Sequence, residues 1–98
     1  MKKQLIATTL LASLFATANA EEIMVSAAAS LTDAFSTIAK NYEKAHPEDQ
    51  VLLNFAGSGA LLQQMENGAP VDVFASADQT TMDKAVEKGL IKDGTRKT

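Results

Sequence analysis

Cysteine is absent from the 98 residues, histidine occurs once, and no hydrophobic run is long enough to cross a membrane comfortably. Without cysteine the chain has neither a disulfide nor thiolate chemistry. His46 alone cannot supply the ligand set of an ordinary transition-metal site, which combines several histidine, cysteine or carboxylate side chains. These absences argue against thiol enzymes, disulfide-stabilised scaffolds and the usual metal-cation centres.

Residues 1–20 have the three-part pattern of a secretory signal peptide. Lys2 and Lys3 form a positively charged start, the run 5–16 is mostly apolar, and an Ala-Asn-Ala sequence suited to cleavage ends at Ala20. We therefore expect cleavage after Ala20 and a mature chain in the periplasm. An amphipathic or anchoring N-terminus is the alternative interpretation.

The mature chain is expected to be acidic. Removing Lys2 and Lys3 from the 9 basic residues leaves 7 against 12 acidic ones, a net charge of −5. Nucleic acids and anionic membranes are bound by basic patches, so this charge argues against both as partners. The remaining residues, about 78 of them, have room for one small domain of three strand–helix units.

The first unit begins with a strand-like run at 23–26, which continues into three alanines and then Ser30. Ser30 and Asp33 resemble a capping box, so we expect Ser30 to cap the following helix and Pro47 to end it. Apolar residues recur along this helix with the spacing of one buried face; they are Leu31, Ala34, Phe35, Ile38, Ala39 and Tyr42.

The second unit combines an apolar strand at 51–55 with a helix from Gly59 to about Asn67. Ser58 stands between two glycines at the junction, where its hydroxyl can cap the helix. The glycines leave that helix end open to approach. A helix N-terminus carries unpaired N–H groups and a partial positive charge, which together suit an anion.

The third unit is expected to contain a strand at 71–75 and a helix capped by Asp78 and terminated by Gly89. Its inner face is predicted to carry Met82, Ala85 and Val86. Asp72 falls within the strand, where a carboxylate needs a hydrogen-bond partner or an edge position, and its role stays open.

Short strands that alternate with amphipathic helices predict an α/β fold, with a parallel sheet and flanking helices. Ligands of such folds bind at the carboxyl ends of the strands, where Ser30 and Ser58 both fall. If the first two strands are neighbours, two helix N-termini converge there and form an anion site from neutral donors. A plain helix cap in a tight turn is the alternative interpretation of each serine.

Enzyme interpretations have less support. The sequence around Ser58 lacks both outer glycines of the G-x-S-x-G nucleophile motif, and His46 is expected at the far end of the first helix. The glycines also lack the spacing of a dinucleotide-binding loop, and there is no Walker sequence. We therefore predict a chain that is not an enzyme and has no cofactor, with a secreted serine hydrolase as the alternative.

Three segments together resemble the periplasmic molybdate-binding proteins that serve ABC importers: AAASLTDAF, NFAGSGALLQQMENGAPVDVFASAD and MDKAVEKGLI. The resemblance implies a type II periplasmic-binding-protein lobe. It also implies that Ser30 and Ser58 bind the molybdate or tungstate oxyanion through hydroxyl and backbone N–H groups, and so contact molybdenum only through its oxygens. The implied partner is the membrane permease of an ABC transporter, and the implied state is a monomer.

Members of that family are longer and have two lobes that close over the ligand. Residues 21–98 resemble the N-terminal portion of lobe one, so we expect an incomplete lobe that binds molybdate more weakly than a complete member. Another tetrahedral oxyanion such as sulfate is the alternative ligand. A non-functional truncated remnant is the third interpretation.

Overall fold

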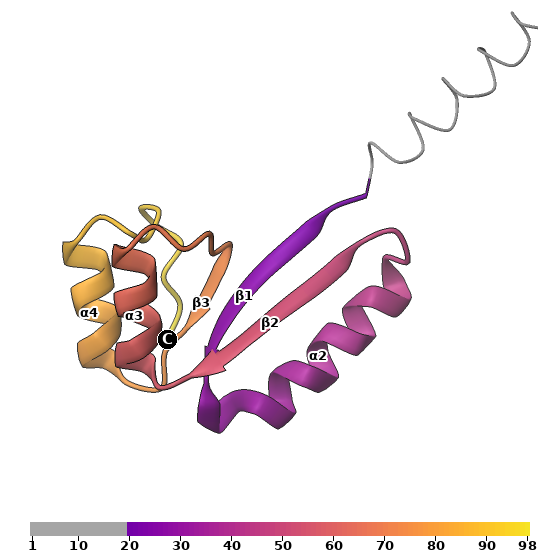
Figure 1. Ribbon diagram of the computed structural model, residues 1–98, viewed down its shortest axis with the longest axis horizontal. Helices are drawn as coiled ribbons and strands as arrows, with labels where there is room; N and C mark the ends of the chain where they lie inside the picture. The colour runs from indigo at the N-terminus through magenta and orange to yellow at the C-terminus, as the bar shows by residue number, and fades with distance from the viewer. Residues whose placement is uncertain (1–19) are drawn as a thin grey trace, which may run out of the picture.

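The computed structural model describes residues 20–98 (Figure 1). The expected signal peptide, apart from Ala20, lies outside these described residues. None of the helices within 20–98 is both long and apolar enough to cross a membrane. In chain order the elements are β1 (Glu22–Ala28), the 3₁₀ turn η1 (Ala29–Leu31), α2 (Thr32–Ala45), β2 (Gln50–Ala56), α3 (Ser58–Glu66), β3 (Val73–Ala75) and α4 (Gln79–Glu87).

β1 lies at the centre of a three-stranded sheet of order β2-β1-β3, and both pairings are parallel. The predicted α/β fold with a parallel sheet is therefore confirmed. The chain moves outward from β1 to β2 and then returns across β1 to reach β3. Because parallel crossovers are right-handed, this reversal places α2 and α3 on opposite faces of the sheet. Figure 1 shows α2 on one side and the α3–α4 pair on the other.

The core of the described residues lies mainly where α3 packs against the sheet. Leu61 is fully buried, and Leu62 and Met65 on the same helix are also buried. Burying one such side chain stabilises a fold by about 1.5 to 3 kcal/mol, so packing holds α3 and its N-terminus firmly in place. The other buried apolar residues are small or β-branched, namely Val25, Ala27, Ala28, Ala39 and Ala85.

The apolar faces predicted for α2 and α4 are too wide. On α2, Ala39 is buried, whereas Ile38 is 56% exposed and Ala34 is exposed as well. On α4, Ala85 is buried but Val86 is 42% exposed. On each helix the apolar face is wider than the strip that packs against neighbouring elements. Apolar residues at the margin of that face therefore stay in contact with solvent.

The predicted cap of the first helix by Ser30 is wrong. α2 begins at Thr32, its N-cap residue is Leu31, and no side chain caps it. Ser30 lies inside η1, the turn between β1 and α2. A capping residue needs non-helical backbone angles, which a residue within a helical turn does not have. The Thr32 hydroxyl donates to the Ala29 carbonyl oxygen at 2.7 Å and ties the turn to the start of α2.

The remaining helix ends agree with the predictions except at the start of α3. That helix begins at Ser58, so the N-cap residue is Gly57 and the predicted cap by Ser58 is wrong. Asp78 caps α4 as predicted, because its side chain accepts a first-turn backbone N–H. Gly89 follows α4 with φ of 72° and terminates that helix as predicted, and Gly68 follows α3 in the same way with φ of 91°.

Asp72 connects the short third strand to the central one. β3 covers only Val73–Ala75, two residues shorter than the predicted strand. Just before it, the Asp72 carboxylate accepts the Met24 N–H at 2.8 Å, and the Asp72 N–H donates to the Met24 carbonyl oxygen at 2.8 Å. The side chain therefore supplies an acceptor that pairs with the backbone of β1, which answers the question that the sequence left open.

Replacing Asp72 by alanine should lower the free energy of unfolding by about 1 to 2 kcal/mol, because the Met24 N–H loses a charged acceptor. Asp72→Asn keeps an acceptor oxygen at the same distance and should lose less. Urea unfolding of residues 21–98, followed by circular dichroism, measures both variants. An Asp72→Ala variant as stable as its parent would show that this contact contributes nothing.

Candidate functional site

The strand register brings the two predicted site serines to the same edge of the sheet. Ala28 at the end of β1 pairs with Ala56 at the end of β2. Ser30 follows the first of these alanines by two residues, and Ser58 follows the second by two. Neighbouring parallel strands lie about 4.8 Å apart, so the two turns leave the sheet side by side. The condition for convergence, that the first two strands are neighbours, is therefore met.

This edge is also the point where the sheet reverses its direction of winding. The chain leaves β1 towards α2 on one face, and it leaves β3 towards α4 beside α3 on the other (Figure 1). Open α/β sheets bind ligands at such a switch point, outside the carboxyl ends of the strands. Ser30 lies on the connection to one face and Ser58 on the helix that covers the other.

Ser58 is the better defined of the two serines. It is 8% exposed, and its Oγ accepts the Ala77 N–H at 2.9 Å. A serine hydroxyl has one hydrogen and two acceptor lone pairs, so accepting from Ala77 leaves its hydrogen free to donate. Ser58 is therefore poised to act as a donor.

The N-terminus of α3 presents backbone donors to open space. The first intrahelical bond runs from the Leu61 N–H to the Gly57 carbonyl oxygen at 3.0 Å. The three N–H groups at 58–60 precede it and have no intrahelical partner. No side chain caps this end, and a Cβ built at Gly57 or Gly59 would meet no atom within 4 Å. The N–H groups at 58–60 are therefore left for water or a ligand to satisfy.

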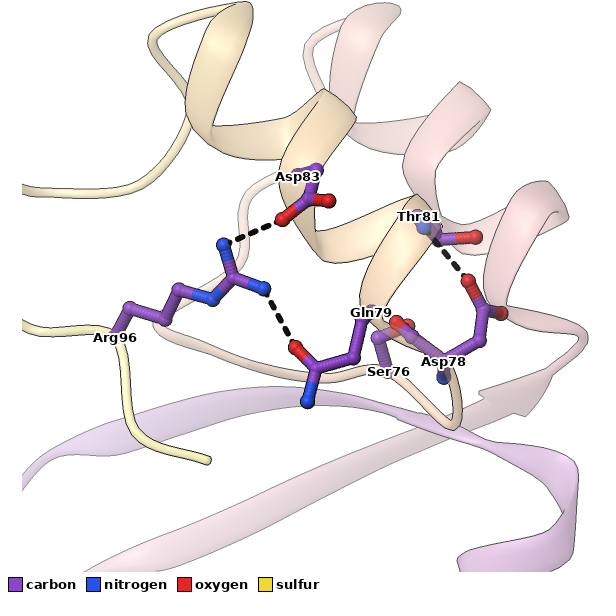
Figure 2. Close-up of polar contacts among 6 residues, drawn as sticks. All are labelled: Ser76, Asp78, Gln79, Thr81, Asp83 and Arg96. Carbon is purple, nitrogen blue, oxygen red and sulfur yellow. Dashed lines mark hydrogen bonds and ion pairs between the residues drawn. The ribbon is translucent and has the colours of Figure 1, made fainter.

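Side-chain caps distinguish α2 and α3 from the third helix of the described chain. Neither α2 nor α3 has a side-chain cap. In α4, by contrast, the Asp78 carboxylate accepts the Thr81 N–H at 2.6 Å (Figure 2). The two helices without a side-chain cap are those that follow β1 and β2, the strands that end side by side. Ahead of α2, the Thr32 N–H donates to the Ala29 carbonyl oxygen within η1.

The charges at this edge are few and include no cation from the adjacent turns. The segments 28–32, 56–60 and 75–79 contain no lysine, arginine or histidine. Asp33 is exposed in the first turn of α2. It forms no capping box with Ser30, because the helix starts at Thr32 with Leu31 as its N-cap residue. The backbone hydrogen bond from Thr81 holds the pKa of Asp78 below its ordinary value of 3.8. Any anion bound here would be held by neutral donors.

Two contacts near this edge could not be read from the sequence. One is the hydrogen bond from the Ala77 N–H to Ser58 Oγ, because an alanine in a turn gives no sequence signal for such a contact. The other is Arg96, whose guanidinium donates to Asp83 and to Gln79, both at 2.7 Å (Figure 2). The segment 92–98 shows no periodic pattern, yet Arg96 attaches it to the N-terminal half of α4.

Two other features of the described residues lie away from this edge. His46 is the C-cap residue of α2, and its ring lies 4.3 Å from that of Tyr42. It is thus at the end of α2 opposite Ser30, as predicted, and far from the position of a general base for Ser58. A cavity of about 530 Å³ lies between β3, α4 and the tail, and neither predicted serine lines it.

The fold is a parallel α/β lobe in which the ends of α2 and α3 that lack side-chain caps lie at the carboxyl edge of the sheet. Residues 23–98 match the family described as bacterial extracellular solute-binding protein. The chain belongs to that family.

Individual relatives support this family assignment. The molybdate-binding protein ModA of Escherichia coli is 48% identical over 83 residues, which cover 85% of this chain and 32% of the relative. The ModA protein of Haemophilus influenzae is 42% identical over 83 residues, covering 85% and 33%. The resemblance to molybdate-binding proteins is therefore confirmed over the matched residues. The chain spans about a third of the length of these curated relatives.

A solved structure shows the same fold at similar identity. It is titled "substrate binding domain of putative molybdenum ABC transporter from Clostridium difficile". It is 41% identical, with a TM-score of 0.66, over 69% of this chain and 30% of that one. The names of these relatives describe molybdate-binding proteins and a substrate-binding domain, and none of the three names an enzyme.

The Asp78 cap should give the fold a defined acid dependence. Because its pKa is lowered on folding, the stability it contributes is complete above about pH 4 and is lost as pH falls through the folded pKa. The urea midpoint of the parent should therefore decrease more steeply between about pH 4 and pH 2 than that of Asp78→Asn, which keeps a capping oxygen without a titratable group. Identical acid profiles for the two proteins would contradict this role.

Proposed function

We propose that residues 21–98 form the N-terminal portion of lobe one of a periplasmic molybdate-binding protein, exported by cleavage after Ala20. In this proposal the protein is a monomer, is not an enzyme, and delivers molybdate or tungstate to the permease of an ABC importer. The observation that carries it is the pair of uncapped helix N-termini at the adjacent ends of β1 and β2. The similarity to ModA proteins, which are named as molybdate-binding proteins, supports the choice of ligand.

The proposed ligand set consists of Ser30 and Ser58, each contributing its hydroxyl and backbone N–H. The buried Ser58 has a hydroxyl hydrogen that its contact with Ala77 leaves free. Each hydrogen bond to a charged acceptor stabilises a complex by about 1.5 to 3 kcal/mol. The serines would contact molybdate oxygens only, so neither a cofactor nor a bound metal cation is part of the proposal.

Neutral donors favour a particular kind of anion. Hydroxyl and N–H groups offer hydrogens to the oxygens of a fully ionised oxyanion, whereas a protonated oxyanion would need an acceptor in return. Since no titratable side chain is proposed to touch the ligand, binding should depend little on pH from the protein side. Sulfate shares the charge and tetrahedral shape of molybdate, and is therefore the comparison ligand in the tests.

The Ser58→Ala variant tests the site directly. It removes the hydroxyl donor but keeps the backbone N–H, so molybdate affinity should fall by about 1.5 to 3 kcal/mol, or roughly 10- to 150-fold. Ser30→Ala should also weaken binding. Ser36→Ala, a matched substitution within α2 six residues after Ser30, should not.

Calorimetric titration of residues 21–98 with molybdate and then sulfate measures these affinities. The proposal requires heat with molybdate, less with sulfate, and a loss that is confined to the Ser30 and Ser58 variants. A Ser58→Ala protein that binds molybdate as tightly as its parent would remove Ser58 from the site. Absence of binding to either anion by the folded parent would contradict the proposed function.

Gly59→Ala should change stability and affinity in opposite directions. Gly59 has no positive φ and its added Cβ would meet no atom within 4 Å, so alanine fits without strain. It should raise the free energy of unfolding by about 0.5 kcal/mol, because alanine favours helix over glycine. The Cα–Cβ bond in a helix leans towards its N-terminus, so the methyl group would enter the space proposed for the anion.

The measurement for Gly59→Ala combines urea unfolding with the same molybdate titration. Higher stability with weaker binding is the expected pair of results. Higher stability with unchanged or tighter binding would show that the anion does not approach this end of α3.

A further inference from the structure

The hydroxyl of Ser58 depends on a residue of a different turn. Its Oγ accepts the N–H of Ala77, which lies 19 residues later, between β3 and α4. Without this bond a serine side chain at a helix start can adopt several rotamers. With it, one lone pair is engaged and the hydroxyl hydrogen points elsewhere. A donor N–H also polarises the hydroxyl and strengthens the hydrogen bond that it donates in turn.

Ala77 is itself held by its two neighbours. The Ser76 hydroxyl donates to the Asp78 carbonyl oxygen at 2.8 Å and accepts the Asp78 N–H at 3.2 Å, so the residues on either side of Ala77 are joined. The Asp78 carboxylate then fixes this turn to α4 by accepting the Thr81 N–H at 2.6 Å. Figure 2 shows Ser76 and Asp78 together at the start of that helix.

We propose that Asp78 is a positioning residue for the oxyanion site. By capping α4 it keeps the Ala77 N–H on Ser58 Oγ, and Ser58 then presents its hydroxyl hydrogen to the bound oxyanion. This inference rests on the proposed function. It adds Asp78, from the turn between β3 and α4, whose carboxylate is engaged by the Thr81 N–H rather than by the ligand.

Positioning and simple electrostatics predict opposite effects of the same substitution. A carboxylate close to an anion site repels the anion, so charge alone predicts tighter binding in both Asp78→Ala and Asp78→Asn. Positioning predicts that Asp78→Ala binds more weakly, because the cap and the turn are loosened. Asp78→Asn should bind at least as tightly as the parent, because asparagine is also a good N-cap residue and the repulsive charge is gone.

The expected size of the effect is a loss of about threefold to tenfold in molybdate affinity for Asp78→Ala, a part of what losing the whole Ser58 hydroxyl bond would cause. In a Ser58→Ala background the same change should have no further effect, because the group that Asp78 positions is absent. Calorimetric titration of residues 21–98 with molybdate measures all four proteins of this cycle.

Gly89→Ala is the matched control for helix stability. It strains the positive φ of 72° just after α4 and so destabilises the same helix from its other end. Under the proposal its molybdate affinity equals that of the parent. If Gly89→Ala weakens binding as much as Asp78→Ala does, the effect belongs to the stability of α4 in general, and the positioning role is overturned.

Amide hydrogen exchange at Ala77 provides a readout that needs no ligand. Its exchange should be faster in Ser58→Ala and in Asp78→Ala, and as slow as in the parent for Asp78→Asn and Gly89→Ala. Unchanged exchange in Asp78→Ala would overturn the inference.

The outcomes separate this inference from the proposed function. Weaker binding in Ser58→Ala, with unchanged or tighter binding in Asp78→Ala, would overturn the positioning role and leave the site intact. No effect of Ser58→Ala on molybdate binding would overturn the site, and the positioning role with it.

Discussion

The parallel register of β1 with its two neighbours is the constraint on which the rest of the structure depends. Because β1 pairs with β2 on one side and β3 on the other, all three strands end at the same edge of the sheet. The reversal in winding sends α2 and α3 to opposite faces from adjacent strand ends. A shift in this register would separate the two serines, even if every helix and strand formed as it does now.

The second constraint is the hydrogen-bonding requirement of helix N-termini. Every helix begins with N–H groups that have no intrahelical partner, and proteins satisfy them with side chains, water or ligands. In the described chain α4 uses Asp78, whereas α2 and α3 have no side-chain cap. Within residues 20–98, α4 therefore satisfies its own first turn, whereas the starts of α2 and α3 are the ends at which we propose that the anion binds. The contact between Ser58 and Ala77 links the two kinds of end.

The fold could be predicted well from the sequence, because short apolar runs, period-3.6 patterns and turn residues are local signals. The glycines at 68 and 89 and the Asp78 cap were predictable for the same reason. Ser30 and Ser58 were placed at the correct edge by a topological rule, but their roles as caps were wrong. Capping depends on whether η1 precedes the helix and on the partner at position 77, and neither is visible locally. The partner of Asp72 lies on β1, 48 residues earlier, and likewise has no local signal.

A molybdate titration of ¹⁵N-labelled residues 21–98, followed by NMR, tests most directly whether the starts of α2 and α3 form a single site. In a single site, the amide signals of segments 29–32 and 58–60 shift together and fit one dissociation constant, while sulfate shifts them less. Shifts confined to one helix end, or centred on the basic residues of the tail at 92–98, would contradict a single site.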